Sequence, residues 1–188
     1  MYERYAGLIF DMDGTILDTE PTHRKAWHEV LGRYGMHFDE AAMVALNGSP
    51  TWRIAESVIA LNQATLDPHQ LAREKTDAVK AMLLDTVRPL PLIDVVKAWH
   101  GRRPMAVGTG SESAIAEALL SHLGLRQYFT AVVAADHVKH HKPAPDTFLL
   151  CAELMGVAPE QCVVFEDADF GLEAARLAGM DAVDVRLL

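Results

Sequence analysis

The stretch that decides the fold is IFDMDGTILD, residues 9–18, near the start of the chain. The apolar run Leu8–Phe10 leads directly into two acids, Asp11 and Asp13, and Gly14 then interrupts the run. This pattern predicts a buried strand that ends in two carboxylates and a turn. Two like charges this close are costly unless a cation lies between them, and oxygen ligands suit Mg²⁺. One carboxylate could then act as a nucleophile while the other transfers protons, although a solvated Asp-Gly turn is the alternative.

The composition is that of an ordinary globular protein with an excess of acidic groups. Its 188 residues are 50% hydrophobic and 23% charged, with a formal net charge of −9. This charge argues against nucleic-acid binding, which needs a basic surface, but not against an anionic small molecule. No apolar run approaches the ~18 residues of a membrane span, the N-terminus lacks a signal-peptide layout, and Cys151 and Cys162 have no metal-ligand spacing. We therefore expect a cytoplasmic protein without membrane or nucleic-acid partners, as a monomer or a weak homo-oligomer.

Alternating strand and helix patterns predict the fold class. Helical periodicity separates the later strand patterns, at Ser113–Leu123, Thr147–Met155 and Gly171–Ala178. This alternation predicts an α/β fold with a doubly wound parallel sheet and right-handed crossovers. The five short apolar runs expected as strands are Gly7–Phe10, Met105–Gly108, Ala131–Ala134, Cys162–Phe165 and Ala182–Val185.

The first crossover is far too long for a simple β–α–β link. About 90 residues separate Asp13 from Met105, where a few dozen would suffice. Helical periodicity fills the gap, and each apolar stripe needs a surface to bury against. We expect a core domain of residues 1–18 and 87–188, and a helical cap domain of residues 19–86 that hangs over the two acids. The helices expected in the cap are Pro21–Tyr34, Asp39–Leu46, Thr51–Leu61 and His69–Leu84.

Further motifs lie at predicted strand ends, where open α/β sheets bind their ligands. Thr109, Gly110 and Ser111 precede a helix, and such loops bind anions through backbone amides and hydroxyls. A dinucleotide fingerprint is not satisfied there, because Ser113 stands where the third glycine belongs. A plain helix-capping turn is the remaining alternative. Lys142, held by a following proline, could neutralise a phosphate or an acid pair, unless it is an ordinary surface lysine.

Acids recur at the end of the fourth apolar run. Glu166 and Asp167 stand there, and beside the acids of the first strand they would complete a cation site of three or four carboxylates. Asp167 as a helix N-cap is the alternative. His137, His140 and His141 are close in sequence, but no further ligand completes a tetrahedral zinc set, so solvated loop histidines are expected.

Together these motifs resemble the four motifs of the haloacid dehalogenase superfamily in order and spacing. The set consists of Asp11-Met-Asp13-Gly-Thr, Thr109 after a strand, Lys142-Pro and Glu166-Asp167. The helical insertion behind DGTILDTE, with HHKPAPDTF at residues 140–148 and VFEDADFG at residues 164–171, is similar to the β-phosphoglucomutase-like branch. The resemblance covers the whole chain and implies a Rossmann-type core with an inserted helical cap.

The resemblance also implies a role for each of these residues. Asp11 is the expected nucleophile and Asp13 the expected general acid/base. The expected substrate-binding residues are Thr109, Gly110, Ser111, Lys142 and, on the insertion, His23, Asn47 and Gly48. The expected Mg²⁺ ligands are Asp11, the main-chain carbonyl of Asp13, and Asp167, with Glu166 in or beside the coordination shell.

We therefore expect a Mg²⁺-dependent phosphatase that hydrolyses small sugar phosphates such as fructose 1-phosphate through an aspartyl-phosphate. One alternative is a phosphosugar mutase, although mutases of this branch tend to carry a lysine where Asn47 stands here. The other is a metal- or phosphate-binding protein without turnover, against which the intact Asp11 and Asp13 argue. On the cap, His23 facing solvent and Asn47-Gly48 serving only as an interhelical turn are the corresponding alternatives.

Overall fold

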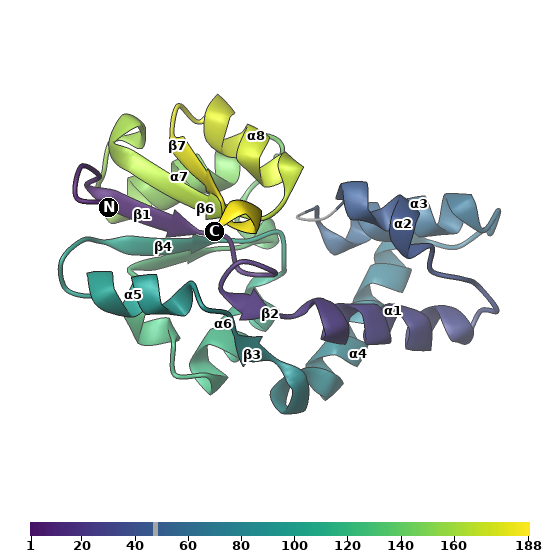
Figure 1. Ribbon diagram of the computed structural model, residues 1–188. Helices are drawn as coiled ribbons and strands as arrows, with labels where there is room; N and C mark the ends of the chain where they lie inside the picture. The colour runs from purple at the N-terminus through teal and green to yellow at the C-terminus, as the bar shows by residue number, and fades with distance from the viewer. Residues whose placement is uncertain (47–48) are drawn as a thin grey trace.

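The sheet at the centre of the protein follows the predicted strands closely. The computed structural model describes residues 1–46 and 49–188. Five strands pair in parallel in the order β5-β4-β1-β6-β7 (Figure 1). The predicted strands are confirmed, with ends that differ by one residue in the last three. The strands are β1 (Gly7–Phe10), β4 (Met105–Gly108), β5 (Ala131–Val133), β6 (Cys162–Glu166) and β7 (Asp181–Asp184).

Helices cover both faces of this sheet, which confirms the doubly wound α/β fold. Alternate strand residues point to opposite faces, so Ile9 and Val164 pack with α7 and α8, whereas Leu8 and Phe10 pack with α5 and α6. Burial on both faces explains why the central strands read as continuous apolar runs. The four helices are α5 (Ile93–Trp99), α6 (Ser113–His122), α7 (Asp146–Met155) and α8 (Asp169–Leu177).

The strand order places the ends of β1 and β6 side by side. Phe10 pairs with Phe165, so the acids that follow each strand leave the sheet at the same level. The chain runs from β1 toward β4 and from β6 toward β7, in opposite directions across the sheet. Ligands of open α/β sheets bind in the crevice that opens where the connections diverge in this way.

The long insertion forms helices that lie beyond the end toward which the β1 arrow points (Figure 1). Helices α1 and α3 both pack against α4, and Trp27, Val30, Val58 and Val79 are buried among them. The helices expected in the insertion are therefore confirmed. Their bounds are α1 (Glu20–Gly32), α2 (Glu40–Met43) with a 3₁₀ turn at Val44–Leu46, α3 (Thr51–Leu61) and α4 (Pro68–Thr86). None of the described helices is both long and apolar enough to span a membrane.

Three short elements escaped the sequence-based prediction. The two segments that join the insertion to the sheet form an antiparallel ribbon of β2 (Leu17–Asp18) and β3 (Arg88–Pro89). Helix α5 follows the ribbon and packs on the sheet. Two-residue strands and a seven-residue helix are too short to show a clear period, which is why no pattern indicated them.

Candidate active site

The turn after β1 places Asp11 and Asp13 at the diverging strand ends. The amide of Asp11 continues the ladder by donating to the carbonyl of Phe165 at 2.9 Å. Gly14 then adopts a φ of +80°, and a Cβ at this position would lie 2.4 Å from an oxygen of Asp167. Glycine is therefore required here both by the backbone and by the close approach of Asp167. Asp13-Gly14 is a turn, but Asp11, two residues before Asp13, is buried and not solvated, and Asp13 is only partly exposed.

Lys142 is buried between two of the predicted site acids. Its Nζ lies 2.7 Å from Asp11 Oδ1, 2.7 Å from Glu166 Oε2 and 3.1 Å from the carbonyl of Gly108. Its side chain is 1% exposed, so it is not an ordinary surface lysine. Burial alone would lower the pKa of Lys142, but the two carboxylates raise it well above its usual range. Lys142 is therefore a fixed positive charge at the sheet end.

The carboxylates around Lys142 form a candidate metal site. Oxygens of Asp11, Glu166 and Asp167 lie within 4.8 Å of one another, and oxygen donors suit Mg²⁺. Thr15 Oγ1 donates to Asp11 Oδ2 at 3.1 Å and to Asp167 Oδ1 at 3.2 Å. Burial and the charge of Glu166 raise the pKa of Asp11, and burial and the charge of Asp11 raise the pKa of Asp167 to about 6. A cation among these carboxylates would relieve their repulsion.

Glu166 supports this site from behind. One of its oxygens accepts from Lys142, and the other accepts from the amides of Asp167 and Ala168 at 3.2 and 3.1 Å. A Cβ on Gly171 would lie 1.9 Å from Glu166 Oε2, so this glycine makes room for the carboxylate. Asp11 and Asp167 therefore have more freely available oxygens for a metal than Glu166 does.

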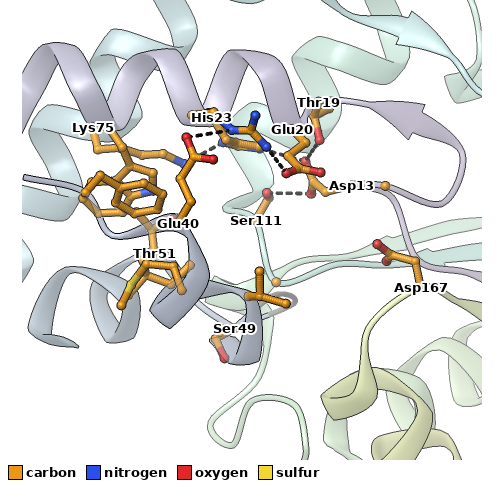
Figure 2. Close-up of a pocket in the computed structure, with 18 of the residues that line it drawn as sticks. Asp13, Thr19, Glu20, His23, Glu40, Ser49, Thr51, Lys75, Ser111 and Asp167 are labelled. Carbon is orange, nitrogen blue, oxygen red and sulfur yellow. Dashed lines mark hydrogen bonds and ion pairs between the residues drawn. The ribbon is translucent and has the colours of Figure 1, made fainter. Parts of the chain in front are cut away.

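Asp13 points to the other side of the turn, toward Thr19, His23 and Ser111 (Figure 2). With Thr109, four donors surround its carboxylate. Thr19 Oγ1 and His23 Nε2 lie 2.5 and 2.8 Å from Oδ1, and the hydroxyls of Thr109 and Ser111 lie 3.2 and 2.9 Å from Oδ2. Burial alone would raise the pKa of Asp13, but the donors hold it well below its usual range. The carboxylate of Asp13 is thus outside the candidate metal cluster, in agreement with its expected role there through the main-chain carbonyl.

Lys75 on α4 completes this side of the site, and the sequence analysis missed it. Its Nζ lies 2.6 Å from His23 Nδ1, and its side chain lies over the ring of Trp27. Burial and the charge of Lys75 lower the pKa of His23, and burial lowers the pKa of Lys75 to about 8. With Lys75 Nζ donating to Nδ1, the geometry favours the tautomer of His23 in which Nε2–H donates a hydrogen bond to Asp13 Oδ1. The signal was present, because Lys75 lies four residues from both Leu71 and Val79 on the apolar stripe of its helix.

A cavity of about 480 Å³ separates the sheet end from the helices of the insertion. Asp11, Asp13, Gly110, Ser111 and Asp167 line it on the sheet side, whereas Thr109 is buried behind Ser111. The helix side contributes His23 and Lys75 together with charged and aromatic residues of α1 and α2. His23 thus faces the cavity and Asp13 and not bulk solvent. Asn47 and Gly48, the expected specificity loop, lie outside the described residues.

Two alternative interpretations of the motifs are wrong. Asp167 does not cap a helix, because α8 begins at Asp169 after Ala168. The zinc interpretation also fails, since His137 Nδ1 accepts from the amide of Ala134, and the described residues form a metal-compatible cluster only at Asp11, Glu166 and Asp167.

Comparison with known proteins agrees with this geometry. The family model described as haloacid dehalogenase-like hydrolase matches residues 5–179. The chain belongs to this family. It is 84% identical over 188 residues to fructose-1-phosphate phosphatase YqaB of Escherichia coli, with all of both chains covered. The resemblance seen in the sequence, to the β-phosphoglucomutase-like branch and within it to bacterial fructose-1-phosphatase, is confirmed.

More distant haloacid dehalogenase-like relatives share the whole architecture. The β-phosphoglucomutase of Bacillus subtilis is 30% identical over 186 residues, which cover 95% of this chain and 82% of the relative. The crystal structure of CbbY from Rhodobacter sphaeroides in complex with xylulose 1,5-bisphosphate has a TM-score of 0.83 at 28% identity. That match covers 95% of this chain and 84% of the other. The expected haloacid dehalogenase-like fold is therefore confirmed over nearly the full length of the chain.

Proposed function

We propose that this hydrolase is a Mg²⁺-dependent phosphatase of small sugar phosphates, with fructose 1-phosphate as a substrate. The 84% identity to a fructose-1-phosphate phosphatase supports the substrate class. The observation that supports this reaction is that two acids on one turn have different surroundings. Asp11 lies against the buried ammonium of Lys142, Asp13 lies among four hydrogen-bond donors, and both line the same cavity.

Asp11 is the nucleophile in this proposal. Lys142 fixes its Oδ1, and Thr15 orients Oδ2, so the carboxylate is held for attack on a phosphorus atom that enters the cavity. The new bond from Asp11 to phosphorus forms as the bond from phosphorus to the sugar oxygen breaks. Mg²⁺, held by Asp11, Asp167 and the Asp13 carbonyl with Glu166 beside them, would neutralise charge on the phosphoryl oxygens.

Asp13 transfers protons in both halves of the reaction. The negative charge of a bound phosphate raises the pKa of Asp13 and so opposes the effect of its four donors. Asp13 protonates the departing sugar oxygen and becomes the carboxylate shown here. In the second half it accepts a proton from the water that cleaves the aspartyl-phosphate, and phosphate leaves. Gly110 and Ser111 line the cavity at the end of β4 and would bind the phosphoryl oxygens, while the hydroxyls of Thr109 and Ser111 hold Asp13 in place.

The helices of the insertion serve as a cap in this proposal, with residues 1–18 and 87–188 as the core domain and 19–86 as the cap domain. The β2–β3 ribbon at the junction is a candidate hinge, since both connections cross there. Closure over the cavity would exclude water and bring His23 and Lys75 to the substrate.

The test is an assay of phosphate release from fructose 1-phosphate by protein treated with EDTA. Activity should be lost without metal and return when Mg²⁺ is added. Without the cation, Asp11, Glu166 and Asp167 are balanced by one buried lysine, and their excess negative charge repels the phosphate. The products should be free phosphate and fructose. Full activity in metal-free buffer would contradict the metal requirement, and conversion to an isomeric sugar phosphate would favour the mutase.

A further inference from the structure

The helix wall of the cavity carries an arginine shared by two carboxylates. Arg24 on α1 donates through Nη2 to Glu20, one turn earlier on the same helix, and its Nε lies 3.3 Å from Oε1 of Glu40 on α2. All three residues line the cavity. In Figure 2, Glu20 and Glu40 lie on the helix side of the cavity, away from Asp167. The mechanism proposed above does not use this cluster, the Glu20–Arg24–Glu40 triad.

The triad makes the helix wall acidic. Two carboxylates face one guanidinium, and the imidazole Nε2 of His28 lies 3.4 Å from Glu40 Oε1. With the histidine counted as neutral, a net negative charge remains. Among the described residues that line the cavity, the other basic groups are His23 and Lys75, and these bond to Asp13 and to each other. The charge of Arg24 is thus already balanced by the two carboxylates. Lys75 is buried against His23. A second phosphate on the substrate would meet two carboxylates without a matching positive charge.

We infer that the Glu20–Arg24–Glu40 triad selects substrates with a single phosphate and an uncharged polyol chain, and rejects bisphosphates. This inference rests on the proposed function, in which the phosphate of the substrate binds at Asp11. Carboxylate oxygens accept hydrogen bonds from sugar hydroxyls, and the remaining N–H groups of Arg24 donate to them. Like-charge repulsion at the same wall discriminates against a second phosphate. Specific binding sites commonly combine attraction of the correct ligand with repulsion of the wrong one.

An apolar surface beside the triad fits the same ligand. Phe38 is partly exposed and stacks on the buried ring of Trp27, with centroids 5.6 Å apart and an interplanar angle of 8°. Both rings line the cavity, as does Met43, and Phe38 presents the accessible part of this surface. Such a surface packs against the C–H face of a sugar, while the triad meets the hydroxyls. A phosphate dianion gains nothing from these groups.

The experiment compares kcat/KM for fructose 1-phosphate and fructose 1,6-bisphosphate, which differ only by the second phosphate. The wild type should favour the monophosphate by on the order of 10-fold or more. Glu20→Gln with Glu40→Gln preserves shape and removes both charges. This double variant should lose most of that preference, chiefly through a lower KM for the bisphosphate. For phenyl phosphate, which has neither hydroxyls nor a second charge, the change in kcat/KM between the two proteins should be far smaller than for the bisphosphate.

A matched control is available on the same helix. Glu29 pairs with Arg33 at 2.8 Å with the same spacing of four residues, but outside the cavity, so Glu29→Gln should leave the preference unchanged. A wild type that hydrolyses both sugars equally, or a double variant that keeps the preference, would overturn the inference. If no ester is hydrolysed, the proposed function fails on its own. The ratio of dissociation constants for the two sugars, measured by calorimetry with Asp11→Asn protein, then decides the selectivity separately.

Discussion

Asp11 and Asp13 are separated by one residue, yet they lie in opposite surroundings. Asp11 belongs to the sheet end, where Glu166 and Asp167 crowd it and Lys142 is the balancing charge. Asp13, at the same sheet end, faces the insertion. Its contacts are the hydroxyls of Thr19, Thr109 and Ser111 and the imidazole of His23, which Lys75 contacts in turn. The pKa of Asp11 is raised by burial and neighbouring acids, whereas the pKa of Asp13 is held low despite burial.

The turn therefore places two chemically identical side chains in two different environments, to which the proposed mechanism assigns two roles. Environments that push the pKa values of paired acids apart are typical of sites with a division of labour. The crowded acid gains most from a metal and a reacting phosphorus atom. In the proposed mechanism, the acid among donors is held in place for proton transfer. The predictions below test whether the two roles are as separate as the contacts indicate.

The largest effect is expected for Asp11→Asn. An amide is a poor nucleophile, so turnover should fall on the order of 10⁴-fold or more. No phosphorylated protein should form with any substrate, as judged by mass spectrometry after rapid acid quench. Retained activity, or phosphate found on another residue, would show that the sheet-end acid is not the nucleophile.

Asp13→Asn should cost less and should depend on the leaving group. With a sugar phosphate, loss of the proton donor and acceptor should lower kcat by ~10²–10⁴-fold. With a nitrophenyl phosphate the first step needs little protonation, so label should accumulate on Asp11 because breakdown is slow. Equal losses for both esters, without accumulation of label, would contradict the division between the two acids.

Lys75 gives the helix side a dependence of stability on pH in the alkaline range. The native state lowers its pKa from 10.5 to about 8, so between these values the unfolded chain binds more protons than the native one. Stability from this group therefore rises as the pH rises from about 8 to 10.5, by up to about 3 kcal/mol. Lys75→Met should lack this rise in urea unfolding across that range.

The control for this prediction is an exposed lysine. Lys97 on α5 is 54% exposed, so Lys97→Met should follow the wild-type pH dependence. If Lys75→Met also follows the wild-type pH dependence, then the rise in stability does not come from the titration of Lys75. Tyrosines and cysteines that titrate in the same range are shared by all three proteins and cancel in the differences.

The sheet was predictable because its signal is local. Four-residue apolar runs such as Gly7–Phe10 and Met105–Gly108 are buried on both faces, and such strands show themselves in composition alone. The β2–β3 ribbon was not predictable, since its register depends on two segments about 70 residues apart and on only two pairs.

The site was predictable where acids follow strands, and not where helices meet. Asp11 and Glu166 share an edge because parallel strands end together, which needs only the strand order. The Lys75–His23 contact needs the packing of α1 on α4, which periodicity does not specify. A lysine on an apolar stripe indicated an unusual position, but its partner was decided by tertiary structure.

The smallest effects should come from two hydroxyls, one for each acid. Thr15 donates to Asp11 and Asp167, and Ser111 donates to Asp13. Removing either hydroxyl should cost roughly 1 kcal/mol of hydrogen bonding, which corresponds to about a fivefold change in an equilibrium constant or a rate. Thr15→Val should raise the Mg²⁺ concentration for half-maximal activity several-fold. Ser111→Ala should leave that concentration unchanged and lower kcat for a sugar phosphate, with a smaller loss for a nitrophenyl phosphate. Equal shifts in metal dependence for the two variants would mean that the two acids act as one cluster. Ser111 contacts Asp13 and not the candidate metal ligands, so its loss could change metal binding only by way of Asp13.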